Sequence, residues 1–369
     1  MMKILYVVST LKRSGPVIVL SNIIKYLDKN RFEPIVLTLS PEPKESMKKY
    51  FENDLNTKVE TLGLGRVQSL FVAKKRIRKF LSENSIDIVH THGFRADALI
   101  SKINGIPKVS TLHNYPFYDY PMTYGKVKGY LMAKIHLYFL RYIDEPRVVS
   151  KSISEILINK NNYNIKYIRN GTETIENLDK NIAKKRTDIE KNKKVFISVG
   201  HLNKRKDPIT IIKAFKKANL KNSELLFLGN GEMREECEKE IGDYKNIKLI
   251  GRVENVYEYL KMSDYFISAS LAEGLPNTVL EAMACGLPCI LSNIPPHLEI
   301  YEINNNASLI FKIKDIDTLS ILIRDIQKRE YNIMSNASKE IVNNHLSAEI
   351  MSKNYQNIYD KLLLQKSKL

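Results

Sequence analysis

Two glutamates eight positions apart mark the part of the sequence whose residue types and spacing could do chemistry. Glu273 lies in a loop after an apolar strand that ends at Ser270, and Glu281 lies just over one turn into a helix that opens around Pro276. The first turn of a helix offers free backbone N–H groups and the positive end of the helix dipole, which favour a phosphate group. We therefore expect a diphosphate to bind at Gly274, Leu275, Pro276, Asn277 and Thr278.

The two carboxylates suit a nucleotide that carries such a diphosphate. Glu281 can accept hydrogen bonds from ribose hydroxyls, and Glu273 can reach the group on the far side of the phosphates. Taken alone, such a pair is more often a loop charge and a solvated helix residue. However, the segment resembles the Glu-x7-Glu signature of retaining glycosyltransferase family 4 at Glu273, Gly274, Pro276, Glu281, Ala282, Met283, Ala284, Gly286 and Pro288.

Basic residues follow an earlier strand and resemble a second part of the same family. The stretch 199–208 is similar to the loop in which the family places an Arg and a Lys on the donor diphosphate. Lys206 matches the Lys, His201 stands where Arg is usual, and Arg205 is a candidate for the missing cation. A solvated Lys-Arg-Lys turn is the structural alternative. The resemblance implies that Glu273, His113, Lys206 and Arg205 are catalytic residues.

The first half of the chain contributes two further matches. Thr111-Leu112-His113-Asn114 ends a strand and resembles the place where the family has a histidine facing the donor sugar; a structural histidine is the alternative. The loop 12–16 resembles the family's glycine-containing loop, although it has Gly15 and a proline where two glycines are more usual. Gly15 and His201 are therefore predicted donor-binding residues beside Lys206, Arg205, Gly274 to Thr278 and Glu281.

Short apolar strands alternate with amphipathic helices along the chain, as in a doubly wound parallel α/β fold. The pattern starts afresh after the Lys-rich stretch 173–194. The resemblance implies the GT-B fold, with two Rossmann-like domains facing across a cleft. The expected domains are 1–170 for the acceptor and 171–346 for the nucleotide-sugar donor, joined near residues 170–190, with a helix in 347–369 crossing back to the first.

Composition and charge indicate where the protein is located and which partners suit it. The three cysteines are too few for a secreted disulfide scaffold, and the first apolar run is too short to span a membrane, so we expect a cytoplasmic protein. The formal charge is +17, and residues 1–150 carry 24 Lys and Arg against 13 Asp and Glu. Basic helices at 70–81 and 126–143 make an anionic inner-membrane surface a candidate partner, with a solvated face as the alternative.

Two short motifs suggest a metal, but their contexts favour other roles. Asp315-Ile316-Asp317 spells a metal-binding Asp-x-Asp, yet it opens a helix at which Asp315 is a suitable N-cap. His90 and His92 lie on one face of a strand end, without a further cluster of ligands. We therefore expect no metal and no cofactor, with fixed cations and helix dipoles stabilising the leaving diphosphate.

The resemblance implies a retaining hexosyl- or N-acetylhexosaminyltransferase that reacts by front-face attack. The expected donor is a nucleotide sugar, UDP-linked by preference, and the expected acceptor is a carbohydrate or a polyprenyl-linked glycan in bacterial capsule or lipopolysaccharide assembly. A sugar-nucleotide epimerase, or a transferase with a soluble acceptor such as malate, keeps the same fold. A nucleic-acid-binding module is the least favoured class because no recognised binding motif accompanies the charge.

Overall fold

Two parallel β-sheets, each covered by helices, organise the computed structural model, which describes residues 1–174 and 193–366. Internal contacts divide the chain into Met1–Gly171 with Ala348–Leu369, and Thr172–Ser347. Both sheets have the strand order of a Rossmann-like fold, so the predicted α/β fold class is confirmed. The part of the expected domain junction that spans 175–192 lies outside the described residues.

The N-terminal unit is built on a seven-stranded sheet in the order β3-β2-β1-β4-β5-β6-β7. Val, Ile and Leu fill its central strands because both faces of a parallel sheet are buried. The strands are β1 (Met2–Val8), β2 (Phe32–Thr38), β3 (Lys58–Thr61), β4 (Ile88–His92), β5 (Lys108–Leu112), β6 (Glu145–Val148) and β7 (Lys166–Tyr167). The helices are α1 (Gly15–Lys25), α2 (Arg66–Glu83), α3 (Phe94–Ile100), α4 (Pro116–Tyr124), α5 (Lys126–Leu140) and α6 (Lys151–Asn161), with a short π-helical turn at Tyr50–Asp54.

The C-terminal unit repeats this plan with a six-stranded sheet in the order β10-β9-β8-β11-β12-β13. Its strands are β8 (Lys194–Val199), β9 (Ser223–Leu228), β10 (Ile247–Gly251), β11 (Tyr265–Ser268), β12 (Cys289–Ser292) and β13 (Ser308–Phe311). Its helices are α8 (Pro208–Ala218), α9 (Arg234–Ile241), α10 (Val256–Met262), α11 (Asn277–Ala284), α12 (Pro295–Ile303), α13 (Ile316–Asp325) and α14 (Tyr331–His345), with 3-10 turns at Asn305–Ala307 and Ile326–Lys328.

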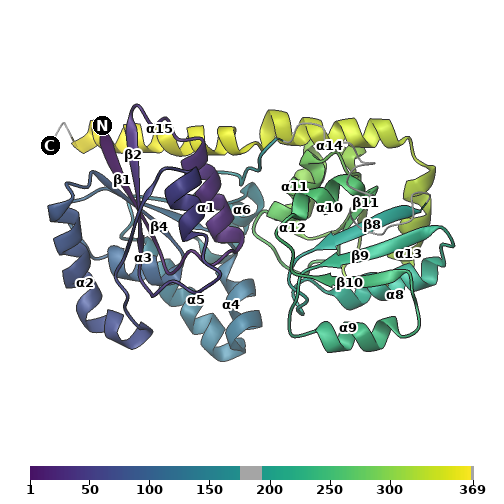
Figure 1. Ribbon diagram of the computed structural model, residues 1–369. Coiled ribbons are helices and arrows are strands. Elements are labelled where there is room, and N and C mark those ends of the chain that lie inside the picture. The colour runs from purple at the N-terminus through teal and green to yellow at the C-terminus, as the bar shows by residue number, and fades with distance from the viewer. Residues whose placement is uncertain (175–192, 367–369) are drawn as a thin grey trace. The chain divides into compact units, whose positions relative to one another are not determined.

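Helix α15 (Ala348–Lys366) packs on α1 in the N-terminal unit (Figure 1). Its Met351, Tyr355, Ile358, Tyr359 and Leu362 belong to the same apolar core as β1 and α1. The hydroxyl groups of Tyr6 and Tyr359 lie 3.2 Å apart in this core. The expectation that a C-terminal helix returns to the first domain is therefore confirmed.

The structure moves one predicted strand and adds two that sequence periodicity did not reveal. The apolar pattern of the sequence also predicts a strand from Arg147 to Ser150. The structure has this strand as β6 at Glu145–Val148, because Ser150 instead caps α6 and accepts a hydrogen bond from the Ile153 N–H. Strand β3 has a single apolar residue, Val59, and β13 has only four residues, so neither produces a clear apolar pattern.

Candidate functional site

Two loops meet where β8 and β11 end, at the point where the strand order of the C-terminal sheet reverses. Ligands of open α/β sheets bind outside the carboxyl ends of the strands at such a point. The Leu271 N–H donates to the Arg205 carbonyl at 2.8 Å, which joins the loop after β8 to the loop after β11. Adjacent strands thus bring together residues that lie almost seventy positions apart.

Glu273 lies at the centre of this junction and pairs with both predicted cations. Its Oε2 lies 2.6 Å from the Arg205 guanidinium, and its Oε1 lies 2.6 Å from Lys206 Nζ. The Ser270 hydroxyl also donates to Oε1 at 2.8 Å, and Arg205 donates to the Ala272 carbonyl at 3.0 Å. The structure therefore places Glu273, Arg205 and Lys206 in one ion-pair network.

The electrostatics of this network keep Glu273 ionised. Burial raises the pKa of a carboxyl group, but the neighbouring Lys206 and Arg205 outweigh it and lower the pKa of Glu273 to about 2. Only 7% of the Glu273 side chain is exposed, against 17% for Lys206 and 23% for Arg205. At neutral pH the cluster therefore holds one buried carboxylate between two partly accessible cations.

Local backbone geometry holds Lys206 over the end of β8. Its N–H donates to the Asn203 side chain at 3.0 Å, and its aliphatic chain crosses Gly200. Gly200 has a φ of +148°, and a Cβ there would lie 3.0 Å from Lys206 Cε, so glycine leaves room for the lysine. A narrow pocket beside this crossing is lined by Ser198, Val199, Gly200, His201, Leu202, Lys206, Pro208, Phe227 and Ser268.

Helix α11 begins one residue later than its predicted opening at Pro276. Pro276 is the extended N-cap residue, and Asn277 and Thr278 form the first turn. Gly274, Leu275 and Pro276 are buried, whereas Asn277 and Thr278 are partly exposed at the helix start. Glu281 is half-buried on the same helix, and its charge helps burial to raise the pKa of Tyr257. The helix start thus lies close in sequence to Glu273, with Glu281 one turn further along.

His201, which stands where the family usually has Arg, lies in the loop after β8. It is exposed, and its Nδ1 lies 3.1 Å from the carbonyl oxygen of Asn230 in the loop after β9. It lines the narrow pocket together with Lys206. The structure therefore places His201 beside Lys206 but outside the Glu273 ion pairs described above.

His113 lines a separate pocket in the N-terminal unit, with a volume of about 680 Å³. The pocket lies where β1, β4 and β5 end, and Ser9, His92 and Asn114 also line it. The His113 Nε2 lies 3.0 Å from the His92 Nδ1, and their rings stack. Gly15 is the first residue of α1, and its neighbour Pro16 rather than Gly15 lines this pocket.

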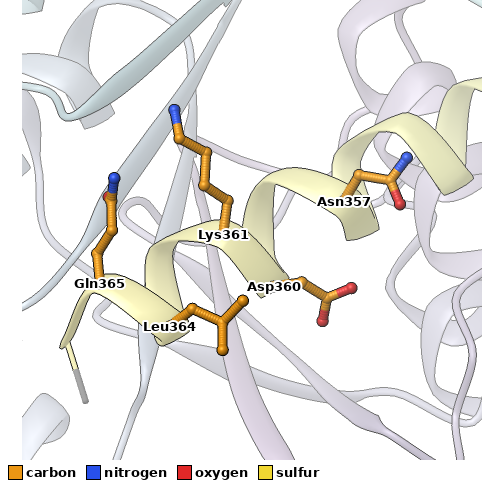
Figure 2. Close-up of a pocket in the computed structure, with 5 residues that line it drawn as sticks. All are labelled: Asn357, Asp360, Lys361, Leu364 and Gln365. Carbon is orange, nitrogen blue, oxygen red and sulfur yellow. The ribbon is translucent and has the colours of Figure 1, made fainter. Parts of the chain in front are cut away.

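A third depression lies on the outer side of α15 and has a volume of about 350 Å³. Figure 2 shows the side chains that line it, which are Asn357, Asp360, Lys361, Leu364 and Gln365. Asp360 and Lys361 pair with Arg31 and Glu145, respectively, at 2.5 Å. None of the predicted site residues lines this depression, so it does not bear on their chemistry.

Two family models together span most of the sequence. The model described as Glycosyltransferase Family 4 matches residues 13–175, and the model described as Glycosyl transferases group 1 matches residues 179–344. The second match includes Glu273, Lys206 and Glu281. The chain belongs to glycosyltransferase family 4.

Relatives of the glycosyltransferase agree in both length and fold. The O-antigen biosynthesis glycosyltransferase WclY of Escherichia coli is 28% identical over 98% of this chain and 99% of its own. An Escherichia coli UDP-Gal:alpha-D-GlcNAc-diphosphoundecaprenol alpha-1,3-galactosyltransferase is 29% identical over 72% of this chain and 73% of its own. Anabaena HepE, crystallised with UDP and glucose, superposes with a TM-score of 0.81 at 16% identity, over 98% of this chain and all of its own, and so shares the GT-B fold.

His297 is a buried residue of this glycosyltransferase, close enough to Glu273 to feel its charge, that the sequence analysis did not single out. It is fully buried on α12, and its Nδ1 lies 2.9 Å from the Ser292 carbonyl. Its Nε2 has no hydrogen-bond partner among the described residues. Burial lowers the pKa of His297 to about 4, although the nearby charge of Glu273 acts in the opposite direction. A lone histidine after two prolines carries no motif that would have revealed it.

The Asp-x-Asp motif of the glycosyltransferase has the predicted structural role. The Asp315 carboxylate accepts the Thr318 N–H at 2.9 Å and its hydroxyl at 2.7 Å, so Asp315 is confirmed as the N-cap of α13. Asp317 instead pairs with Lys217. Both ring nitrogens of His90 have hydrogen-bond partners, because they lie 2.7 Å from the Tyr359 hydroxyl and 2.8 Å from the Thr111 hydroxyl.

The buried histidines of the N-terminal unit predict a loss of stability in acid. Burial lowers the pKa of His90 to about 3, that of His113 to about 4, and that of His92 well below its usual value. Their pKa in the unfolded chain is about 6.5, so the unfolded state takes up protons first as the pH falls below that value. The contribution of these three histidines to folding stability should be fully present above pH 6.5 and should decrease as the pH falls towards 4.

Thermal unfolding at several pH values tests this prediction. We expect the melting temperature to fall by at least about 5 °C between pH 7.5 and pH 4.5, with a shallower dependence in His92→Asn, which loses one of the titrating groups. A melting temperature that is flat over this range would contradict the prediction.

Proposed function

We propose that this glycosyltransferase moves a sugar from a nucleotide diphosphate sugar, UDP-linked by preference, to a carbohydrate or lipid-linked acceptor in bacterial surface polysaccharide assembly, with retention of configuration. The observation that carries the proposal is the network of Glu273, Lys206 and Arg205 next to the start of α11. The O-antigen role in the name of the full-length relative and the UDP and glucose bound to the structural neighbour support it.

The proposed chemistry begins with an exchange of ion-pair partners. Lys206 and Arg205 are partly accessible and neutralise Glu273 in the structure described here. A diphosphate that reaches them would compete with Glu273 and accept hydrogen bonds from N–H groups at Asn277 and Thr278. These fixed donors would then stabilise the negative charge that grows on the leaving phosphate oxygen.

Glu273 suits electrostatic stabilisation of the reacting sugar better than nucleophilic attack on it. Retention by two displacements would require a carboxylate that bonds to the anomeric carbon. The Glu273 carboxylate has a pKa of about 2, three hydrogen-bond or ion-pair partners and little exposure, which make it a weak nucleophile. We therefore propose front-face attack by the acceptor, with Glu273 stabilising the developing positive charge and the leaving phosphate receiving the acceptor's proton.

We further propose that Lys206, Arg205 and the start of α11 perform leaving-group stabilisation without a metal. Sugar transfer should then proceed at the same rate in excess EDTA, and the product should keep the anomeric configuration of the donor in a proton NMR spectrum. Loss of activity on chelation with recovery in Mn²⁺ would refute metal independence. An inverted product would refute retention.

Glu281 is the proposed acceptor of hydrogen bonds from the donor ribose. Glu281→Ala should weaken UDP binding about tenfold or more, because a hydrogen bond to a charged group contributes roughly 1.5 to 3 kcal/mol. Calorimetric titration with UDP measures this loss. Glu258→Ala is the matched control, since Glu258 is a helical glutamate of the same unit outside the proposed site. Equal UDP affinity for Glu281→Ala and the wild type would exclude the ribose contact.

A further inference from the structure

An apolar and aromatic surface covers the outer side of α4 and α5 in the N-terminal unit. Val127 is 86% exposed, Leu131 58% and Met122 52%. We call this surface the α4–α5 face and define it by its exposed large side chains, which are Tyr118, Met122, Tyr124, Val127, Tyr130, Leu131, Ile135 and Tyr138. Soluble monomers rarely expose so continuous an apolar patch unless it contacts a partner or a membrane.

The exposure of this face is a consequence of how tightly the two helices pack on their inner side. A Cβ at Gly129 would lie 2.4 Å from the backbone nitrogen of Pro121, so α5 contacts the α4 backbone directly there. On the buried side of α5, the His136 ring lies 2.6 Å from the Tyr120 hydroxyl and 2.7 Å from the Asp97 carboxylate. Figure 1 shows α4 and α5 side by side in this unit. Rotation of α5 to bury its outer residues would break these contacts.

The charges on α5 and just after it are all of one sign. Lys126, Lys128, Lys134 and Arg141 are basic, and α5 contains no acidic residue. Lys134 Nζ lies 4.9 Å from the centre of the Tyr130 ring, so cation and aromatic ring share one part of the surface. A helix with exposed apolar and aromatic residues and several lysines is typical of proteins that lie on an anionic bilayer.

Helix α2, the other basic helix, lacks such apolar anchors among its described side chains. Ala73 and Ile77 are buried in the core, and Val72 is the single large apolar side chain of α2 that is exposed among those described. Its basic residues Lys75, Arg78 and Lys79 are exposed to solvent. Both helices are membrane candidates from sequence, and among the described side chains of the two, only α5 combines several exposed large apolar residues with basic ones.

We propose that the α4–α5 face docks on an anionic phospholipid bilayer, with its aromatic and aliphatic side chains at the headgroup boundary and its lysines on lipid phosphates. The inference rests on the proposed function in one respect, because Tyr124 and Lys128 also line the pocket of His113. A saccharide carried on a lipid diphosphate in the same bilayer would then enter the His113 pocket next to the face that contacts the bilayer. No helix among the described residues is long and apolar enough to cross a membrane.

Co-sedimentation with vesicles tests the proposal on the full chain. The probe is a series of vesicles with 0, 15 and 30% phosphatidylglycerol in phosphatidylcholine. The bound fraction of wild-type protein should increase with the anionic fraction of the vesicles. Salt at 0.5 M should release the protein, because it screens the attraction between the basic side chains and the anionic lipids. The substitutions Val127→Ser, Leu131→Ser and Ile135→Ser, made together, should weaken binding at least tenfold. The matched control, Ile313→Ser, Ile321→Ser and Ile333→Ser, removes three exposed isoleucines of the other unit and should bind as the wild type does.

A second pair of variants distinguishes docking by this face from the non-specific attraction of any basic surface to anionic lipid. Lys126→Gln, Lys134→Gln and Arg141→Gln should reduce binding at least fivefold more than Lys75→Gln, Arg78→Gln and Lys79→Gln on α2, although both triples remove the same charge. Circular dichroism confirms that each variant is folded. UDP affinity should be unchanged in all four variants, since the residues proposed to bind UDP, which are Lys206, Arg205, Glu281 and the start of α11, lie in the C-terminal unit.

The outcomes that overturn the proposal differ from those that would overturn the proposed function. Wild-type binding by the serine triple on α5, or equal losses in the two glutamine triples, would refute docking by the α4–α5 face. A wild-type dimer that dissociates in the serine triple, without vesicle binding, would assign the face to a second copy of this chain. Vesicle binding without any affinity for UDP would preserve the docking proposal and refute the proposed donor.

Discussion

Replacing Glu273 with Gln is expected to reduce sugar transfer by about 10²- to 10³-fold while UDP affinity stays equal or increases. The rate should fall because a neutral amide cannot stabilise positive charge on the sugar, and loss of one preorganised electrostatic group has this order of effect. Nucleotide affinity should not fall, since Glu273 competes with the diphosphate for Lys206 and Arg205. Steady-state transfer rates and calorimetric titration with UDP measure the two quantities.

Glu224 provides a matched control for this substitution. It is a buried carboxylate of the same unit, with Lys193 Nζ at 3.2 Å and Lys248 Nζ at 3.0 Å, but it lies at the start of β9 rather than at the carboxyl ends of the strands. Glu224→Gln should lower stability by breaking a buried ion pair, as Glu273→Gln also does, yet leave transfer unchanged. Equal transfer rates in the two variants would show that Glu273 is a structural carboxylate.

The pH dependence of Glu273 gives a second readout for the same variant. Its pKa is about 2 in the folded protein and about 4.3 in an unfolded chain. The ion pairs therefore stabilise the fold fully above about pH 4.3, and this contribution is lost as the pH falls towards 2. Glu273→Gln should remove this part of the acid dependence, whereas the dependence due to the histidines above pH 4 should persist.

Replacing Lys206 with Ala is expected to weaken UDP binding by roughly 10- to 100-fold and uridine binding by less than twofold. The ammonium group is the proposed partner of the diphosphate, and a hydrogen bond to a charged group contributes about 1.5 to 3 kcal/mol. Transfer should decrease by more than binding, because negative charge on the leaving oxygen grows as the sugar departs. Titrations with UDP, UMP and uridine separate the contribution of the diphosphate.

Lys204 is the control for this second substitution, since it lies in the same loop and is exposed to solvent. Lys204→Ala should leave both UDP affinity and transfer near wild-type values. If Lys206→Ala reduced uridine and UDP binding by the same factor, Lys206 would act on the shape of the loop rather than on the phosphates.

Local sequence was enough to predict most strands of both sheets and the loops that follow them, although not β3 and β13. Continuous apolar runs such as Ile4 to Val8 identify strands buried on both faces, and the helical segments between them indicate parallel strands. The Glu-x7-Glu segment and the basic loop around Lys206 were likewise visible, because both are contiguous motifs. The family and its fold followed from these residues.

Side-chain partners across the sheet were decided by the tertiary structure alone. No local pattern shows that Glu273 pairs with Arg205 and Lys206, because the adjacency of β8 and β11 creates these ion pairs. Burial of His297 and the stacking of His92 on His113 depend in the same way on neighbouring strands.

The sequence by itself determined which residues of α5 are apolar and which are basic, but not which of them face solvent. Val127, Leu131 and His136 all lie on this one helix, and its apolar residues occupy more than one stripe, so periodicity left both a core helix and a surface helix open. The structure buries His136 against Asp97 and Tyr120 and leaves Val127 and Leu131 exposed. The physical reason is that a helix can bury one side against its neighbours, and the close approach of α4 at Gly129 together with the long-range contact of His136 with Asp97 selects that side.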